Sequence, residues 1–180
     1  IKGKKALKRL QAKRLIGMTQ PVSRMYSNKR AWTYDVEVHG YRYHLANIHA
    51  AIGVSQIEDF GKIKSTRVKT VKFYNKNIVD HVFLEKPVLS KGIVPFIYFL
   101  RIKNNLREKF MEYMSKNKID TGIHWQPANK FKLFKKLKNS HLIETNKVAK
   151  EIVTIPLHSN MKHRDQKKIV KIINNFFKYL

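Results

Sequence analysis

Apolar positions in the first sixty residues of this chain follow helical spacing in two places, with an extended pattern between them. Leucines set among lysines predict an exposed helix over residues 4–15, and Gly17 is placed to end it as a C-terminal cap. Apolar and polar residues alternate over residues 32–38, which predicts a short strand or extended arm that Gly40 ends. The second helical pattern begins near Leu45.

The helix predicted from Leu45 onward contains small residues that would let another backbone approach closely. Its apolar or small positions have the spacing i, i+3, i+4 and i+7, at Ile48, Ala51, Ile52 and Ser55. This pattern predicts a packed helix. We expect Gly61 to mark a kink or junction, beyond which a longer and more polar helix runs to about Asp80.

The second half of the chain alternates between strand and helix patterns. We predict strands over residues 93–102 and 121–125, and helices over residues 106–116 and 142–152. The last helix has the clearest apolar stripe, at Ile169, Ile172, Ile173, Phe176 and Leu180. Together these elements predict an α+β unit in which helices pack against a small sheet.

Composition limits the class of protein. The chain has 180 residues and 43% hydrophobic content, enough to bury one good core, so we place residues 61–180 in one α+β domain and residues 1–60 at the end of another. The longest apolar run, residues 93–100, is far below the roughly 18 residues that a membrane span needs. With no cysteine, a disulfide framework and a thiolate metal site are excluded. We expect a cytoplasmic protein, and, because position 1 is Ile1, a sequence that begins inside a longer reading frame or after processing.

A formal net charge of +26 is the strongest compositional signal and, taken alone, favours a polyanionic partner such as nucleic acid. Residues 1–34 contain ten lysines or arginines and no acidic residue, and residues 130–138 form a second basic cluster. However, zinc-finger spacing, an aromatic RNA-binding box and an arginine-rich arm are all missing. We therefore favour a general bias toward lysine, and a non-catalytic basic module that binds nucleic acid or an anionic surface stays as the alternative.

The most specific stretch is GYRYHLANIHAAIGVSQI, residues 40–57. It resembles the segment Gly-Tyr-Asn-Tyr-Arg followed by Ala-Ala-Ile-Gly-Leu-x-Gln-Leu in the DegT/DnrJ/EryC1/StrS family of sugar aminotransferases. Two later blocks are similar to family motifs in the same order: GIHWQP at residues 122–127 resembles Gly-Ile/Val-x-His-Tyr-x-Pro, and IPLHSNM at residues 155–161 resembles Leu-Pro-Leu-x-Pro-x-Met. Three ordered matches indicate that the resemblance extends over nearly the whole chain.

The resemblance implies an α/β protein of the fold-type I class that depends on pyridoxal 5'-phosphate. This chain would be a fragment of it, holding the end of the large domain and the α+β small C-terminal domain. Such an enzyme would be a homodimer with shared active sites, and it would move an amino group, with glutamate as the expected donor, to a keto-sugar nucleotide in polysaccharide or aminosugar biosynthesis.

Three residues match family positions that contact cofactor or substrate. Arg42 stands where the family usually has Asn, which there reaches the cofactor phosphate of the partner subunit; a guanidinium also suits a phosphate. His44 stands where the family has Arg or Lys facing the nucleotide sugar, although a histidine that caps the following helix fits equally well. His124 matches a position that lines the substrate pocket, with a surface or core histidine as the alternative.

The lysine that holds the cofactor covalently is expected upstream of this chain. Lys62 and Lys64 lack the Ser-x-x-x-Lys context that surrounds it in the family. The sequence also contains no His-Glu-x-x-His, no Gly-x-Ser-x-Gly and no glycine-rich phosphate loop. We therefore expect no catalytic residue and no metal site in this chain, and the chain alone should be inactive.

Overall fold

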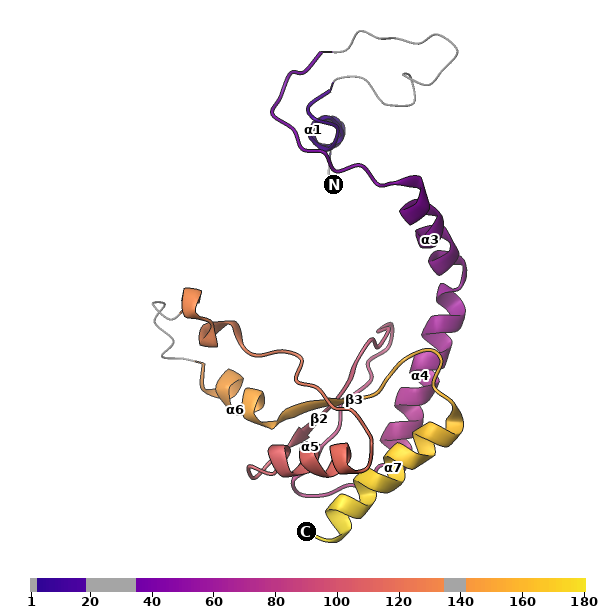
Figure 1. Cartoon of the computed structure of the whole chain (residues 1–180), viewed down its shortest axis with the longest axis vertical. Coiled ribbons are helices and arrows are strands. Elements are labelled where there is room, and N and C mark those ends of the chain that lie inside the picture. The colour runs from indigo at the N-terminus through magenta and orange to yellow at the C-terminus, as the bar shows by residue number, and fades with distance from the viewer. Residues whose placement is uncertain (1–2, 19–34, 135–141) are drawn as a thin grey trace. The chain divides into compact units, whose positions relative to one another are not determined.

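The computed structural model describes residues 3–18, 35–134 and 142–180 of the chain (Figure 1). The chain divides into two compact units, Ile1–Glu58 and Asp59–Leu180. Helices and strands both occur, so the fold is of mixed α and β type.

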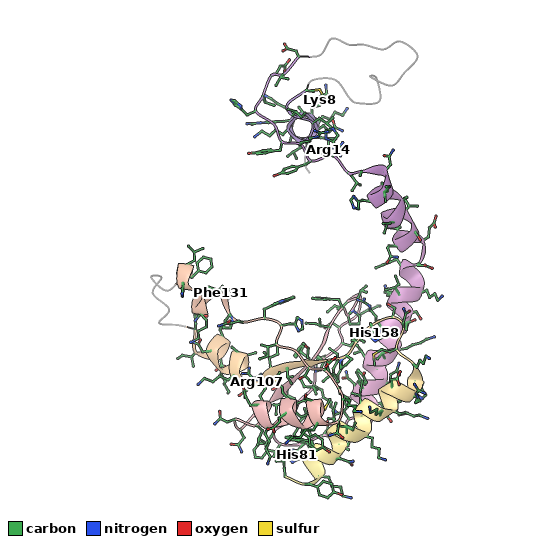
Figure 2. The ribbon with its side chains drawn as sticks, in the orientation of Figure 1. Lys8, Arg14, His81, Arg107, Phe131 and His158 are labelled. Atoms are coloured by element: carbon green, nitrogen blue, oxygen red, sulfur yellow. The ribbon has the colours of Figure 1, made fainter. Side chains whose placement is uncertain are left out.

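The first unit contains two helices, α1 (Lys4–Arg14) and α3 (Asn47–Glu58). Five of the basic residues of α1, Lys8 and Arg14 among them, are exposed, as its polar composition predicted (Figure 2). Helix α3 forms where the sequence predicted it, but none of its side chains is buried. The expectation of a packed helix is thus not met by the described residues, since none of them covers its apolar side chains.

A close backbone crossing follows α1. Gly17 has φ +85°, a conformation that favours glycine, and a Cβ atom there would collide with the carbonyl oxygen of Val38. A Cβ atom on Gly40 would collide with the backbone at Gly17. In place of the strand predicted over residues 32–38, the structure has one isolated bridge between Met18 and Val36, and residues 32–34 lie outside the described part of the chain. At this crossing, neither Gly17 nor Gly40 leaves room for a side chain.

The second unit packs helices against a three-stranded antiparallel sheet of order β1-β2-β3. Its elements, in chain order, are α4 (Phe60–Asn77), β1 (Leu84–Glu85), β2 (Tyr98–Ile102), α5 (Arg107–Lys116), α6 (Ile143–Glu151), β3 (Ile152–Ile155) and α7 (His163–Lys178), with two short 3-10 helices at Ala128–Lys130 and Lys132–Phe134. In the register, Leu84 pairs with Ile102, and Tyr98 pairs with Ile155. Figure 1 shows α4 and α7 side by side, and the two helices are in contact.

The core lies between the sheet and these helices. Alternate residues of β2 are buried, and so is the apolar stripe of α7 except Leu180, which follows the helix and is 48% exposed. Two buried tyrosines meet edge to face, with ring centroids 5.0 Å apart: Tyr74 donates its hydroxyl hydrogen to the Pro156 carbonyl (3.0 Å), and Tyr98 to Asn75 (2.7 Å). Burial raises the pKa of both hydroxyls, so they remain hydrogen-bond donors.

Two strand predictions and the end of one predicted helix differ from the structure. Strand β2 begins only at Tyr98, because Pro95 has no N–H to donate to a sheet. Residues 121–125 contain an isolated bridge from Gly122 to Thr154 instead of a strand. The helix predicted to residue 152 ends at Glu151, and the β-branched run after it forms β3. Gly122 therefore lies beside β3, which is an edge strand of the sheet.

Candidate functional site

Arg42 lies in an extended segment whose backbone is fixed by three hydrogen bonds. The Tyr41 N–H donates to the Lys13 carbonyl (2.6 Å), the Ile16 N–H to the Tyr41 carbonyl (3.1 Å), and the Tyr43 N–H to the Arg14 carbonyl (3.0 Å). The rings of Tyr41 and Tyr43 stack, with centroids 5.3 Å apart. The backbone at Arg42 is thus fixed by the hydrogen bonds of the tyrosines on both sides of it.

The Arg42 side chain is exposed and makes no hydrogen bond or ion pair with any described residue. Its guanidinium therefore keeps all its donors available, and a guanidinium binds a phosphate in a bidentate way. The backbone segment that pairs with Arg42 contains Lys13 and Arg14. The residues that make these hydrogen bonds therefore include basic side chains and no carboxylate that could compete with a phosphate for the guanidinium. The donor set fits the phosphate group of pyridoxal phosphate.

His44 lies two residues beyond Arg42 on the same exposed segment, ahead of α3. Its imidazole makes no hydrogen bond with a described residue, so the structure provides no capping bond to the following helix in that part of the chain. Arg42 and His44 therefore come from one stretch of backbone.

His124 belongs to the second unit, and its side chain has a hydrogen-bond partner among the described residues. Its Nδ1 atom lies 2.8 Å from the Thr154 hydroxyl oxygen, and the same hydroxyl donates to the Gly122 carbonyl at 3.1 Å. Two backbone hydrogen bonds join Gly122 and Thr154, at 3.1 and 2.7 Å. The residue is exposed, and Nε2 makes no hydrogen bond with a described residue.

Aromatic side chains continue the surface around His124. The Trp125 ring lies edge-on to the imidazole with centroids 5.4 Å apart, and it is roughly parallel to Phe96 at 6.4 Å. Trp125 is 67% exposed, although a core position is the commoner place for a tryptophan. This surface of flat rings beside a hydrogen-bonding group is suited to contact with a sugar ring.

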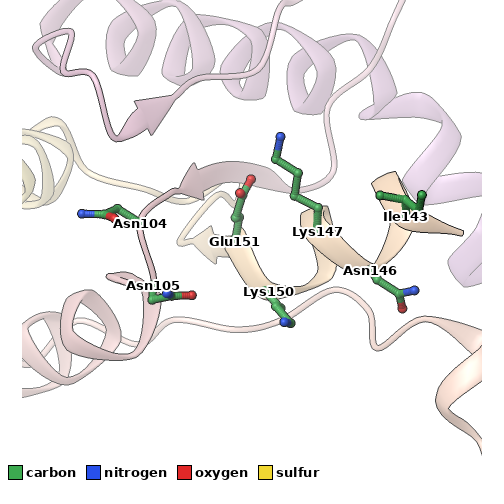
Figure 3. Close-up of a pocket in the computed structure, with 7 residues that line it drawn as sticks. All are labelled: Asn104, Asn105, Ile143, Asn146, Lys147, Lys150 and Glu151. Atoms are coloured by element: carbon green, nitrogen blue, oxygen red, sulfur yellow. The ribbon is translucent and has the colours of Figure 1, made fainter.

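A separate pocket of about 480 Å³ lies between α6 and the loop after β2 (Figure 3). It is lined by Asn104, Asn105, Ile143, Asn146, Lys147, Lys150 and Glu151. Glu151 is already paired with Arg101 at 2.7 Å. None of the three predicted site residues lines this pocket, and nothing in its lining indicates a reaction.

The remaining structural searches concern metals and membranes. In the part of the chain that the structure describes, no three histidine, aspartate or glutamate side chains gather as metal ligands would. Within the same residues, no helix combines the length and apolar character needed to cross a membrane. His158 is exposed just before the turn at residues 159–160 (Figure 2).

Known proteins show similarity over nearly the whole chain. An uncharacterised protein of Methanocaldococcus jannaschii is 25% identical over 171 residues, covering 89% of this chain and 43% of the relative. A UDP-4-amino-4,6-dideoxy-N-acetyl-beta-L-altrosamine transaminase of Campylobacter jejuni is 24% identical over 146 residues, covering 77% of this chain and 39% of the relative. The chain spans about two fifths of the length of these curated relatives.

Solved structures share the fold. The aminotransferase TlmJ from Streptoalloteichus hindustanus has a TM-score of 0.84 at 16% identity, covering 99% of this chain and 47% of its own. Helicobacter pylori PseC, an aminotransferase involved in the biosynthesis of pseudoaminic acid, has a TM-score of 0.80 at 18% identity, covering 94% and 45%. The family model of the DegT/DnrJ/EryC1/StrS aminotransferases matches residues 6–174, which confirms the resemblance predicted from the three motifs. The chain therefore belongs to the DegT/DnrJ/EryC1/StrS aminotransferase family.

Proposed function

We propose that this chain is the C-terminal part of an aminotransferase that moves an amino group from glutamate to a keto-sugar nucleotide, using pyridoxal phosphate. The observation that carries the proposal is the family match over residues 6–174. The transaminase of Campylobacter jejuni, whose name specifies a UDP-linked amino sugar, supports the substrate class. Residues 1–60 would complete the large domain, and residues 61–180 would form the small domain.

Each proposed site residue has a binding role. Arg42 holds the phosphate of the cofactor bound to the partner subunit, because its exposed guanidinium has no partner among the described residues. His44 and His124 contact the nucleotide-sugar substrate. Pyridoxal phosphate supplies the electron sink for amino-group transfer when it is bound. The residues of this chain therefore bind and orient, and the lysine that reacts with the cofactor belongs to the longer protein.

A homodimer follows from this assignment. If Arg42 reaches the cofactor of the other subunit, each active site needs residues from both chains. Because the chain spans about two fifths of its curated relatives, the complete enzyme also needs the residues that bring the lysine. The 180-residue chain alone should be inactive.

The decisive experiment uses the enzyme with the lysine-bearing domain in place. Incubation with glutamate and a UDP-linked 4-keto sugar should give 2-oxoglutarate and a product in which an amino group replaces the keto oxygen, detectable by mass. His124→Ala should raise KM for the sugar nucleotide, whereas His158→Ala, which removes another exposed histidine of the same unit, should not. Failure to form 2-oxoglutarate with any keto-sugar nucleotide would refute the proposal.

A further inference from the structure

The seat of the His124 imidazole consists of two residues from different parts of the second unit. Thr154 belongs to β3, is 5% exposed, and has both its backbone hydrogen bonds to Gly122 in place. A Cβ atom built on Gly122 would lie 2.8 Å from Cε1 of His124 and 3.2 Å from its Nδ1. The ring therefore rests directly on the glycine, and only a residue without a side chain leaves room for it.

The two contacts of the Thr154 hydroxyl favour one protonation pattern of the His124 ring. A threonine hydroxyl has a single hydrogen to donate, and the Gly122 carbonyl, 3.1 Å from the Thr154 hydroxyl oxygen, can only accept it. Both contacts are hydrogen bonds at the same time only when Nδ1 of His124, 2.8 Å from the same oxygen, is the donor. A neutral imidazole has one N–H, so Nε2 is left with a free lone pair. No described residue donates to that atom.

We propose that Thr154 is a positioning residue that holds His124 in the Nδ1–H tautomer and thereby makes Nε2 a hydrogen-bond acceptor for a hydroxyl or amino group of the sugar. The inference rests on the proposed function, which brings the sugar to His124. It limits which group of the substrate His124 contacts, because a neutral acceptor pairs with an O–H or N–H donor and not with a phosphate oxygen. Phosphate recognition is left to cationic residues such as Arg42.

Nitrogen-15 NMR of the labelled 180-residue chain at about pH 8, where an ordinary imidazole is neutral, tests the tautomer directly. The two ring nitrogens of a neutral imidazole differ strongly in chemical shift according to which one is protonated. Comparison with the His124→Gln spectrum assigns the signals. We expect unprotonated Nε2 in the wild-type chain and in Thr154→Ser, and loss of this preference in the isosteric Thr154→Val.

His163 is an internal control. Its Nδ1 lies 3.3 Å from the side-chain oxygen of Gln166, and the amide nitrogen of Gln166 donates to Thr70. Because an amide oxygen can only accept, His163 should also have a protonated Nδ1, for a reason unconnected with Thr154. The His163 signals should not change in Thr154→Val. Gly122→Ala should change the His124 signals as Thr154→Val does, because the added methyl group moves the ring off its seat.

Two results would overturn the positioning role: a protonated Nε2 on His124 in the wild-type chain, or unchanged His124 signals in a folded Thr154→Val chain. The first needs no variant of Thr154, so the inference can fail even if that variant does not fold. None of these readouts depends on activity. A wild-type His124 in the expected tautomer, together with an unaltered KM in His124→Ala, would refute the substrate contact and leave the positioning intact.

Discussion

At the residue scale, the segment around Arg42 shows how backbone pairing can present a binding group without burying it. The backbone N–H groups of both flanking tyrosines donate to carbonyls next to or at the end of α1, and the two rings stack. The guanidinium is left exposed, with no partner among the described residues. Ordering the backbone in advance lowers the entropy lost when a phosphate binds, so the cost of binding falls mainly on one side chain.

Replacement of Arg42 by alanine should weaken cofactor retention in the dimer of the complete enzyme. A hydrogen bond to a charged group contributes about 1.5–3 kcal/mol, so the dissociation constant for pyridoxal phosphate should rise about tenfold to a hundredfold. Equilibrium dialysis followed by cofactor absorbance measures the change. Arg42→Lys should give a dissociation constant between those of the wild-type enzyme and Arg42→Ala, because lysine keeps the charge but not the bidentate fork.

Arg9, an exposed arginine on α1 with no proposed role, provides the matched control. Arg9→Ala removes the same charge from the same unit and should leave cofactor retention unchanged. If Arg42→Ala retains the cofactor as tightly as Arg9→Ala does, Arg42 has no part in the site.

Sequence patterns found some of the candidate site and missed the rest for a physical reason. Arg42, His44 and His124 each lie in a motif, so their positions could be predicted from order along the chain. Thr154 carries no such signal, because a threonine within a β-branched run is an ordinary strand residue. Its proposed role depends on pairing with Gly122, more than thirty residues away, and one sequence does not reveal a long-range pairing.

At the element scale, prediction succeeded where one face of a long element is buried. The apolar stripe of α7 predicted four of its core residues, because sixteen residues give several turns over which the period repeats. Strands β1 and β3 were missed, since elements of 2 and 4 residues are too short to show a period. The boundary between α6 and β3 has no glycine or proline to announce it.

Asn174 joins two helices of the second unit, and its loss should be measurable as stability. From α7, its amide nitrogen donates to the Asn77 carbonyl at the end of α4 (2.9 Å), and its oxygen accepts from the Val79 N–H (3.0 Å). Asn174→Ala should lower the free energy of unfolding by about 1–2 kcal/mol in urea titrations. Asn175→Ala, next to it, removes an amide with no hydrogen bond to a described residue and should stay within about 0.5 kcal/mol. Equal losses in the two variants would contradict the joining role.

The ion pairs of Glu85, on the edge strand β1, should make the free energy of unfolding depend on pH. A hydrogen bond from Lys103 is the largest cause that lowers the pKa of Glu85, and the charge of Arg101 lowers it further. Because the folded pKa lies below the unfolded value of about 4.3, this stabilisation is present above that pH and is lost as the pH falls through the folded pKa. Glu85 is largely exposed, so its effect should stay within about 1 kcal/mol.

Glu85→Gln should therefore reduce the urea midpoint slightly at pH 7 and have little effect at pH 3. Lys103→Gln removes the main partner and should reduce the same pH-dependent difference. The double variant should lose less than the sum of the two single variants, because both changes remove one interaction. Additive losses would show that Glu85 and Lys103 act independently.

At the scale of the whole molecule, part of the charge of +26 comes from exposed lysines and arginines on several described elements. Helix α1 has five lysines or arginines among its described exposed residues, and α7 exposes further lysines between its buried apolar positions. Charges spread over exposed residues of several described elements are typical of a general composition bias, which fits a family of enzymes better than a sequence-reading module. Nucleic-acid binding that depends on this charge alone should therefore be unspecific.

Retention of the 180-residue chain on immobilised DNA, compared with heparin, tests this expectation. Binding through released counterions falls steeply with salt, so retention should disappear from both matrices over the same range, between about 50 and 200 mM salt. Competitor DNA of unrelated sequence should displace the chain as well as the immobilised sequence does. Retention on DNA at salt concentrations that clear the heparin column, or preference for one sequence, would instead indicate contacts to bases that neutralised charge cannot provide. That result would favour a binding role for this chain beside its membership of an aminotransferase family.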